Sequence, residues 1–412
     1  MDHMEAPVLE ALARYHRRGA LPFTPPGHKQ GRGADPEVVK VLGDEVFRTD
    51  LLAFGGLDDR LGSGRVLERA EALMADAVRA GHTFFSTCGS SLSVKAAMLA
   101  VAGPHETLLV GRDAHKSVVS GLIISRVRPV WVEPEWDGAR HIAHPPSAAS
   151  FERTFDACPE ARGALVTSPT PYGSCADLAG IAEVCHRRGR PLIVDEALGG
   201  EELLGAALRR AHAVREEIEA IGGLHVDGRA DYVGPGLATD FDPFPVVIDL
   251  TGLGVSGYRA ADWLRDHHDV NAHLADHRRI SAQLTHADDT STTGVLLTAL
   301  RDLAGHADDL RPAPEVAVPA PGELRMAQSC LPRDAYFGSV ADVPLARAAG
   351  RVAAEMITPY PPGIPAVLPG EVLKQPVLDY LRTGVKAGMN LPDAADPGLD
   401  TIRVLVEGTG AD

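Results

Sequence analysis

Residues 191–210 read PLIVDEALGGEELLGAALRR, and this stretch decides the fold that we expect for the chain. An apolar run ends at Asp195, which is how a buried parallel strand delivers an acid to the edge of a sheet. An amphipathic helix follows within a few residues, and Gly222 and Gly223 supply its stop. We therefore expect Asp195 at a sheet edge, where it either serves a site or caps the next helix.

Length and charge exclude several classes of protein. The chain has 412 residues, a formal net charge of −16 and five cysteines, none in a CxxC pair. The acidic balance disfavours partners such as nucleic acids and anionic membranes. No apolar run is long enough for a membrane span, and the N-terminus lacks a signal-peptide pattern. We expect a cytoplasmic protein with free thiols.

Strand-like and helix-like segments alternate from His82 onward. The predicted strands are HTFFST, TLLVG, PVWVEP, GALVTSP and PLIVDE, at 82–87, 107–111, 129–134, 163–169 and 191–196. Helical patterns lie between them, at 91–103, 117–125 and 177–189. This alternation predicts an α/β fold: a mostly parallel sheet with helices on both faces and all strand C-termini at one edge.

The rest of the chain predicts further, smaller α/β regions. A long helix is expected over 201–223, followed by a strand, a helix, two short β-like runs and another helix. A Pro-rich linker occupies about 311–323. We predict an N-terminal segment at 1–60, a large domain at 61–200, a small α/β domain at 201–315 and a C-terminal region at 316–412.

Several polar groups fall at the predicted sheet edge. Gly89, Ser90 and Ser91 begin a helix, where backbone N–H groups and hydroxyls can bind phosphate, although a plain Ser cap fits equally well. His115 follows the next strand and can stack on a flat ring or simply bond to backbone. Ser168 ends another strand, where Pro169 also favours an ordinary turn.

Taken together, these groups suit pyridoxal phosphate (PLP). A phosphate cradle, an imidazole that can stack and a strand-end acid occur in this order along one edge. The acid keeps the pyridine nitrogen protonated, so the ring withdraws electrons from a carbanion. The histidines and cysteines show no metal-ligand spacing, and GxSxG is absent, so we expect no metal site and no Ser-His-Asp hydrolase.

The chain resembles the ornithine/lysine/arginine decarboxylase family of fold-type-I PLP enzymes, in its short bacterial form. The motifs that carry the resemblance are TPPGHKQG, TCGSS, RDAHKSV, SPTPYG, PLIVDEA, DLTGLGVSGYRAADWLR, ADHRR and PYPPGIPAVLPGE. Ser168 is expected in the cofactor set because its hydroxyl can donate to a ring hydroxyl. The resemblance implies that Gly89, Ser90 and Ser91 hold the phosphate. It implies that His115 stacks on the ring, Asp195 pairs with the ring nitrogen, Ala197 packs against the ring and Glu371 lies near the substrate.

One part of the family pattern is missing. Family members follow DEA with a His-containing turn, more strands and a loop whose lysine binds the cofactor covalently. Here LGG and a helix follow, and no lysine occurs between Lys116 and Lys374. Neither of these lysines lies in the matching motif. Three explanations remain open: a segment is omitted from the sequence, the gene carries a true deletion, or the protein is a natural non-catalytic relative.

The resemblance implies PLP-dependent decarboxylation of arginine, lysine or ornithine to the amine and CO₂, with His115 and Asp195 as catalytic residues. An aminotransferase remains an alternative within the same fold, and a non-catalytic partner subunit is an alternative from another class. Fold-type-I enzymes build their sites across subunits, so a homodimer or a larger homo-oligomer is expected.

Overall fold

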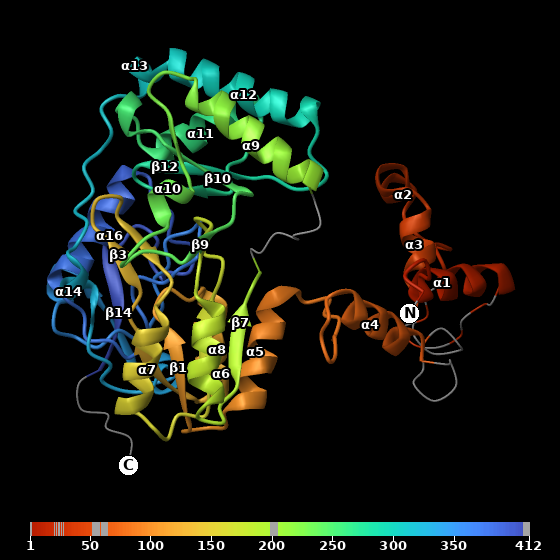
Figure 1. The fold of residues 1–412 in the computed structure, drawn as a ribbon, viewed down its shortest axis with the longest axis horizontal. Helices are drawn as coiled ribbons and strands as arrows, with labels where there is room; N and C mark the ends of the chain where they lie inside the picture. Colours follow the sequence, from red (N-terminus) through yellow and green to blue (C-terminus); the bar gives the residue numbers. More distant parts are fainter. Residues whose placement is uncertain are drawn as a thin grey trace. The chain divides into compact units, whose positions relative to one another are not determined.

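Figure 1 shows a computed structural model of the chain, which describes residues 2–19, 21, 23, 25, 27, 29–51, 58, 65–197 and 205–406. The chain forms two compact units, Met1–Thr87 and Cys88–Asp412, which are described separately. The helices of the first unit are α1 (Pro7–Arg18), α2 (Pro36–Leu42), α3 (Glu45–Thr49) and α4 (Val66–Ala77). Helix α1 begins at a proline, ends at Gly19 in the left-handed region and packs against α4.

A four-stranded parallel sheet is the centre of the second unit. Its order is β2-β1-β5-β7, with strands β2 (Arg128–Val132), β1 (Thr107–Gly111), β5 (Ala164–Thr167) and β7 (Leu192–Asp195). Thr167 of β5 lies opposite Asp195 of β7, so both strands end at the same level. The C-terminal ends of the strands therefore share one edge, as the sequence predicts.

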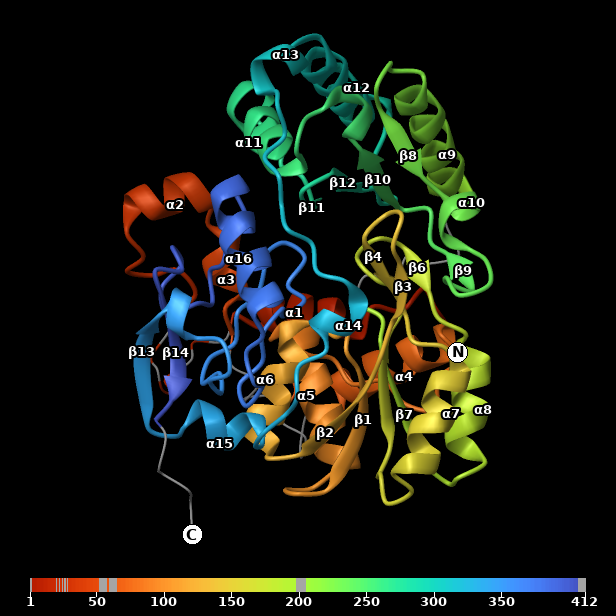
Figure 2. The ribbon, with the colours of Figure 1, turned by 90° about the vertical axis from the view of Figure 1, so that its left-hand side faces the viewer.

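Helices cover both faces of this sheet, which confirms the predicted α/β class (Figures 1 and 2). On one face, α5 (Gly89–Val101) and α6 (Lys116–Ser125) pack against Leu108 and Val110. On the other face, α7 (Ala148–Ala157) and α8 (Leu178–His186) pack around Leu109 of the same strand. The alternation of side chains along a strand divides the apolar core into these two layers.

A second sheet follows in the chain, with order β11-β12-β10-β8 and antiparallel pairing. Its strands are β8 (His225–Asp227), β10 (Pro245–Asp249), β11 (Leu274–Ala275) and β12 (Arg279–Gln283). It shares one apolar core with α9 (Gly205–Glu219), α11 (Gly257–His268) and α12 (Thr290–Gly305). Figure 2 shows these helices beside the sheet. The start of the predicted helix, 201–204, lies outside the described residues.

The C-terminal part has its own core, in which α16 (Gln375–Ala387) packs with the paired strands β13 (Val340–Pro344) and β14 (Thr401–Leu405). Shorter elements complete the unit: β3 (Glu135–Asp137), β4 (Ile142–His144), β6 (Ser174–Cys175), β9 (Asp240–Phe241), α10 (Arg229–Tyr232), η1 (Thr251–Leu253), α13 (Ala307–Leu310), α14 (Pro321–Leu324), α15 (Pro332–Tyr336) and η2 (Leu345–Arg347). None of the described helices has both the length and the apolar character needed to cross a bilayer.

The strand predicted at residues 82–87 is wrong. This segment has neither strand nor helix structure, and Phe84 and Phe85 expose 82% and 49% of their surface. A strand needs a neighbour that accepts and donates its backbone hydrogen bonds. No described strand pairs with 82–87, so its apolar side chains have no sheet to join.

Candidate active site

The edge formed by the ends of β1, β5 and β7 holds most of the predicted site residues. Asp195 closes β7 and is 5% exposed. One of its carboxylate oxygens accepts a hydrogen bond from the backbone N–H of Ala197 at 3.2 Å. Its backbone carbonyl accepts a hydrogen bond from the N–H of Ser168 at 3.1 Å. The parallel register thus places a buried carboxylate and the end of β5 side by side.

His115 caps the N-terminus of α6 through its ring. Nδ1 accepts a hydrogen bond from the backbone N–H of Ser117 at 3.2 Å, so the ring proton of the neutral form resides on Nε2. Burial lowers the pKa of His115, whereas the nearby Asp195 carboxylate raises it. Burial prevails, and the ring is an uncharged flat surface at neutral pH.

A glycine lies directly against the His115 ring. A Cβ added at Gly363 would come within 2.8 Å of both Cδ2 and Nε2 of His115. Gly363 also has φ of +95°, and its carbonyl accepts a hydrogen bond from the N–H of Lys116 at 2.9 Å. Only glycine allows this approach, which attaches the PYPPGIP segment to the turn that carries the imidazole.

The residues predicted to bind phosphate lie in the first turn of α5. Gly89 and Ser90 are exposed, Ser91 is half-buried, and Cys88 before them makes no side-chain capping hydrogen bond. A helix of 13 residues presents a partial positive charge at this end. Helix α5 contacts both α6, which begins directly after His115, and β7, which ends at Asp195.

Ser168 has a structural task in the SPTPYG turn. Its buried hydroxyl oxygen accepts a hydrogen bond from the N–H of Ala176 at 3.0 Å. The neighbouring Thr170 hydroxyl likewise accepts one from Ser174 at 3.2 Å. The turn therefore explains the hydrogen bonds that both hydroxyl oxygens accept. The Ser168 hydroxyl can still donate its own hydrogen to a further partner.

Glu371 is bound to an arginine that the sequence did not single out. Its carboxylate is 1% exposed, lies 3.3 Å from Nη2 of Arg112 and accepts the Leu368 N–H at 2.9 Å. Burial raises the pKa of Glu371, and the Arg112 charge opposes this rise. Arg112 also donates to the carbonyl of Pro365 at 2.9 Å. These contacts join the PGE motif to the residue after β1 and leave Glu371 little freedom to bind a substrate cation.

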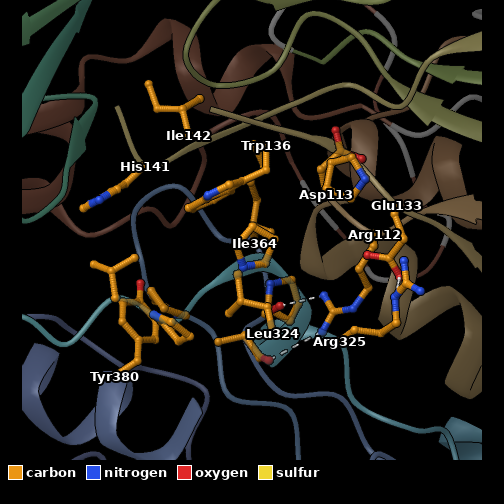
Figure 3. Close-up of a pocket in the computed structure, with 18 of the residues that line it drawn as sticks. Arg112, Asp113, Glu133, Trp136, His141, Ile142, Leu324, Arg325, Ile364 and Tyr380 are labelled. Carbon is orange, nitrogen blue, oxygen red and sulfur yellow. Dashed lines mark hydrogen bonds and ion pairs between the residues drawn. The ribbon is translucent and has the colours of Figure 1, made fainter. Parts of the chain in front are cut away.

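A cavity of about 270 Å³ lies next to this pair (Figure 3). The ends of β1 and β2, the β3–β4 hairpin, the 318–326 segment and the PYPPGIP segment form its walls. Glu371 and Asp113 line it, whereas Gly89, His115 and Asp195 do not. The cavity nevertheless adjoins the sheet edge, because Arg112 and Asp113 follow β1 and because Pro362 and Ile364 flank Gly363, which lies against His115.

The two lysines nearest the edge in sequence are already engaged. Lys116 forms an ion pair with Asp393 at 2.9 Å, and its ammonium lies 4.8 Å from the centroid of the Tyr360 ring. Lys374 donates to the carbonyl of Gly322 at 3.3 Å. These contacts join the two lysines to Asp393, Tyr360 and Gly322, none of which is a predicted cofactor residue.

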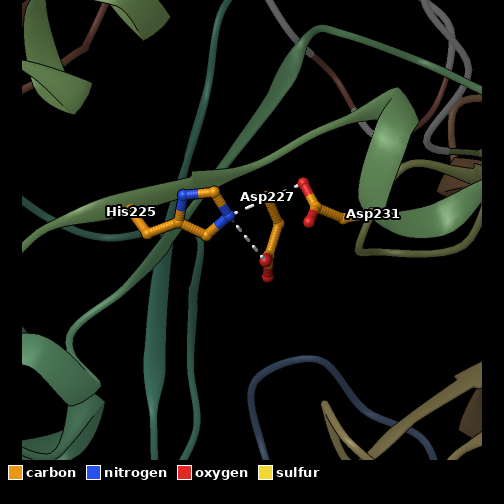
Figure 4. A group of neighbouring side chains, drawn as sticks. All are labelled: His225, Asp227 and Asp231. Carbon is orange, nitrogen blue, oxygen red and sulfur yellow. Dashed lines mark ion pairs between the residues drawn. The ribbon is translucent and has the colours of Figure 1, made fainter.

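Three side chains elsewhere come close enough to suggest a metal site: His225, Asp227 and Asp231 (Figure 4). Asp227 already pairs with the fully buried Arg279 at 2.9 Å, and Asp231 pairs with Arg140 at 2.6 Å. Both carboxylates are thus neutralised by guanidinium groups. The cluster is an ion-pair network that joins the β3–β4 hairpin to the antiparallel sheet.

Comparison with known proteins agrees with this geometry. The family model described as "Orn/Lys/Arg decarboxylase, major domain" matches residues 6–223, and the model of the C-terminal domain of that family matches residues 317–396. The first match covers more than half of the chain. The protein therefore belongs to the Orn/Lys/Arg decarboxylase family, whose members are PLP-dependent lyases of fold type I.

Full-length relatives and a solved structure share this fold. An arginine decarboxylase of Halalkalibacterium halodurans is 29% identical, with 98% of each chain covered. An arginine decarboxylase of Bacillus subtilis is 27% identical, with 99% of each chain covered. The structure of the Escherichia coli constitutive lysine decarboxylase has a TM-score of 0.77 at 18% identity and covers 98% of this chain and 82% of that one.

The relatives contain residues that this chain lacks. The Halalkalibacterium alignment extends over 484 residues, whereas 98% of 412 residues is about 404. About 80 aligned positions therefore have no residue in this chain. The described β7 has a neighbour on one side only, which is the place where a sheet would continue if more strands followed Asp195.

Replacement of Asp113 by Asn should stabilise the protein at high pH. Burial raises the pKa of this carboxyl from 3.8 to about 7, against the opposing effects of its own backbone N–H and Arg112. The neutral acid is thus favoured in the folded state, and wild-type stability falls as the pH rises from about 4 to about 7. Each pKa unit corresponds to about 1.4 kcal/mol, so Asp113→Asn should gain up to about 4 kcal/mol at pH 8 and little at pH 4. Urea unfolding at both pH values measures this, and an equal effect at both would contradict it.

Replacement of Asp227 by Asn should destabilise the protein by about 3 kcal/mol, because it deprives the buried Arg279 of a counter-charge. The midpoint of urea unfolding reports the change. Asp266→Asn on the exposed face of α11 is the matched control and should shift stability by less than about 0.5 kcal/mol. Equal effects of the two variants on the free energy of unfolding would show that the ion-pair network does not stabilise the fold.

Proposed function

We propose that this protein serves PLP-dependent decarboxylation of a basic amino acid, with arginine as the preferred substrate. The observation that carries the proposal is the buried Asp195 carboxylate at the end of β7, within electrostatic reach of the neutral His115 ring. A strand-end acid beside an uncharged imidazole suits a protonated pyridine ring better than it suits a sugar or a metal ion.

Each group at the edge has a distinct task in this proposal. The N–H groups of the first turn of α5 and the hydroxyls of Ser90 and Ser91 bind the phosphate. The His115 ring covers one face of the cofactor, and Asp195 holds the proton on the ring nitrogen. A cofactor held in this way would supply an electron sink for the decarboxylation. Ser168 and Ala197 complete the wall around the ring.

The same proposal explains what the 412-residue chain lacks. All its edge groups are non-covalent ligands, and no lysine lies between Lys116 and Lys374. We infer that the about 80 aligned positions without a residue here form one segment, and that this segment carries the covalent lysine of the relatives. We place that segment after Ala197, where β7 forms the edge of the sheet. The chain as it stands then binds PLP weakly and does not turn over.

Arginine is favoured among the basic amino acids by the extent of similarity. Four relatives named arginine decarboxylase match over 90% or more of this chain. The lysine decarboxylases of Pseudomonas aeruginosa and Escherichia coli match over 46% and 32% of it.

The location and assembly are further parts of the proposal. The described residues include all five cysteines, and none of them forms a disulfide, which suits a reducing cytoplasm. A homodimer is expected because fold-type-I sites draw residues from two subunits. The missing lysine also favours a second candidate, a non-catalytic partner subunit that retains the fold and the cofactor edge.

The chain should bind added PLP without releasing CO₂ from arginine, lysine or ornithine. Equilibrium dialysis measures the binding, and His115→Ala should weaken it about tenfold because a stacked ring contact is lost. His212→Ala on the exposed face of α9 is the control and should leave binding unchanged. Failure of the wild-type chain to bind PLP would overturn the assignment of the sheet edge.

Insertion of the lysine-bearing segment of the Halalkalibacterium relative after Ala197 should restore CO₂ release, with arginine preferred over lysine. The restored strands would pair with β7 and provide the covalent lysine. The same insertion with its lysine changed to alanine is the matched control. If the insertion restores the fold but not decarboxylation, the result favours the partner-subunit candidate. Release of CO₂ by the chain without the insertion would contradict the proposal.

A further inference from the structure

One side chain at the sheet edge is buried without a partner. Thr167 is the last residue of β5 and is 7% exposed, and its hydroxyl oxygen makes no hydrogen bond with any described residue. A buried hydroxyl without a partner costs free energy, whereas a valine of the same shape does not carry this cost. Both residues are β-branched and suit a strand equally well, so the strand itself gives no reason for the hydroxyl.

The alternation of side chains along the strands determines the face of the sheet on which this hydroxyl lies. Leu165 of β5 and Ile193 of β7 belong to the core layer beneath α5 and α6, and the next residue of each strand belongs to the opposite layer. Thr167 and Asp195 follow two residues after this pair and lie opposite each other in the parallel register. Both side chains are therefore on the face that α5 and α6 cover.

The groups that we expect to hold the cofactor begin on that same face. Ser90 and Ser91 lie in the first turn of α5, and His115 directly precedes α6. Helix α5 also contacts β7, as Figure 1 shows. Neighbouring strands lie about 4.8 Å apart, so Thr167 is within the width of one aromatic ring of a group that Asp195 binds.

Ser168 is the neighbouring residue whose hydroxyl we expected to donate to the ring hydroxyl of the cofactor, and it is placed differently. Its oxygen accepts a hydrogen bond from the N–H of Ala176 at 3.0 Å, in the turn that leads to α8. Ala176 packs against the core layer beneath α7 and α8, which is the face opposite to Asp195. The structure therefore favours Thr167 over Ser168 as the donor at the end of β5.

We propose that Thr167 is an additional cofactor-binding residue, whose hydroxyl donates a hydrogen bond to the ring hydroxyl oxygen of PLP while Asp195 binds the ring nitrogen. This inference rests on the proposed function, because it requires PLP at the sheet edge. The bond gives the buried hydroxyl the partner that the chain does not supply. It also holds the ring at two points on neighbouring strands, which prevents rotation about the contact with Asp195.

The experiment compares PLP with 3-deoxypyridoxal phosphate, which lacks the ring hydroxyl, by equilibrium dialysis against the full chain. The wild-type chain should bind PLP about tenfold more tightly than the deoxy compound, because one hydrogen bond to an ionisable oxygen is lost. Thr167→Val should weaken PLP binding by the same factor and leave the affinity for the deoxy compound unchanged. The two losses should not add, because both remove the same hydrogen bond. Thr167→Ser keeps a hydroxyl and should retain the preference for PLP.

A second measurement separates a binding role from a structural role. Without PLP, Thr167→Val should raise the midpoint of urea unfolding or leave it unchanged, because a methyl group replaces an unpaired buried hydroxyl. Thr293→Val on α12 is the matched control, since Thr293 is 6% exposed and its hydroxyl donates to the carbonyl of Asp289 at 2.8 Å. This control should leave the affinities for both ligands unchanged.

Three results would overturn the proposed role of Thr167: equal PLP affinity in the wild-type chain and Thr167→Val, equal weakening of both ligands by this variant, or a lower unfolding midpoint in the absence of PLP. PLP binding by the wild-type chain with no preference over the deoxy compound rejects the role of Thr167 alone. Failure of the wild-type chain to bind PLP rejects the proposed function as well, so the two failures are distinguishable.

Discussion

The parallel pairing of β1, β5 and β7 is the constraint on which the rest of the second unit depends. Thr167 lies opposite Asp195, and both strands are covered by helices on their two faces. A slip of one residue would exchange the two faces and move the Asp195 side chain to the opposite side of the sheet. The same register brings the residue that follows each strand to one edge of the sheet. Groups that are far apart in the chain therefore lie at the same edge, although no direct contact between them fixes their positions.

The unpaired side of β7 explains several features together. The apolar segment 82–87 forms no strand, β7 has one neighbour, and the long relatives contain about 80 more aligned residues than this chain. The last two follow if the sheet of the relatives continues beyond β7. The missing lysine is then one consequence of a larger change, which also removes hydrogen-bond partners from a buried sheet edge.

Arginines organise the buried charge around the site and away from it. Arg112 holds Glu371 and the carbonyl of Pro365, which attaches the PYPPGIP segment to the turn that carries His115. Arg279, itself fully buried, holds Asp227 in the antiparallel sheet. A guanidinium suits both places because its planar donors bind carboxylates and carbonyls at once. Asp113 has no such partner, because neither of its oxygens accepts a hydrogen bond from another described residue.

Local patterns in the sequence determined most of the helices and strands. They also determined the acid at the end of β7, the helix start near Gly89 and the position of His115 after β1. These features depend on residues that are near neighbours in the chain. The pairing of Arg112 with Glu371, 259 positions apart, was decided by the tertiary structure alone. The tertiary structure alone also decided that 82–87 forms no strand, and it formed the cavity from stretches spread between Arg112 and Tyr380. A contact between remote segments leaves no period in either of them, so only the folded chain shows which side chains share a buried space.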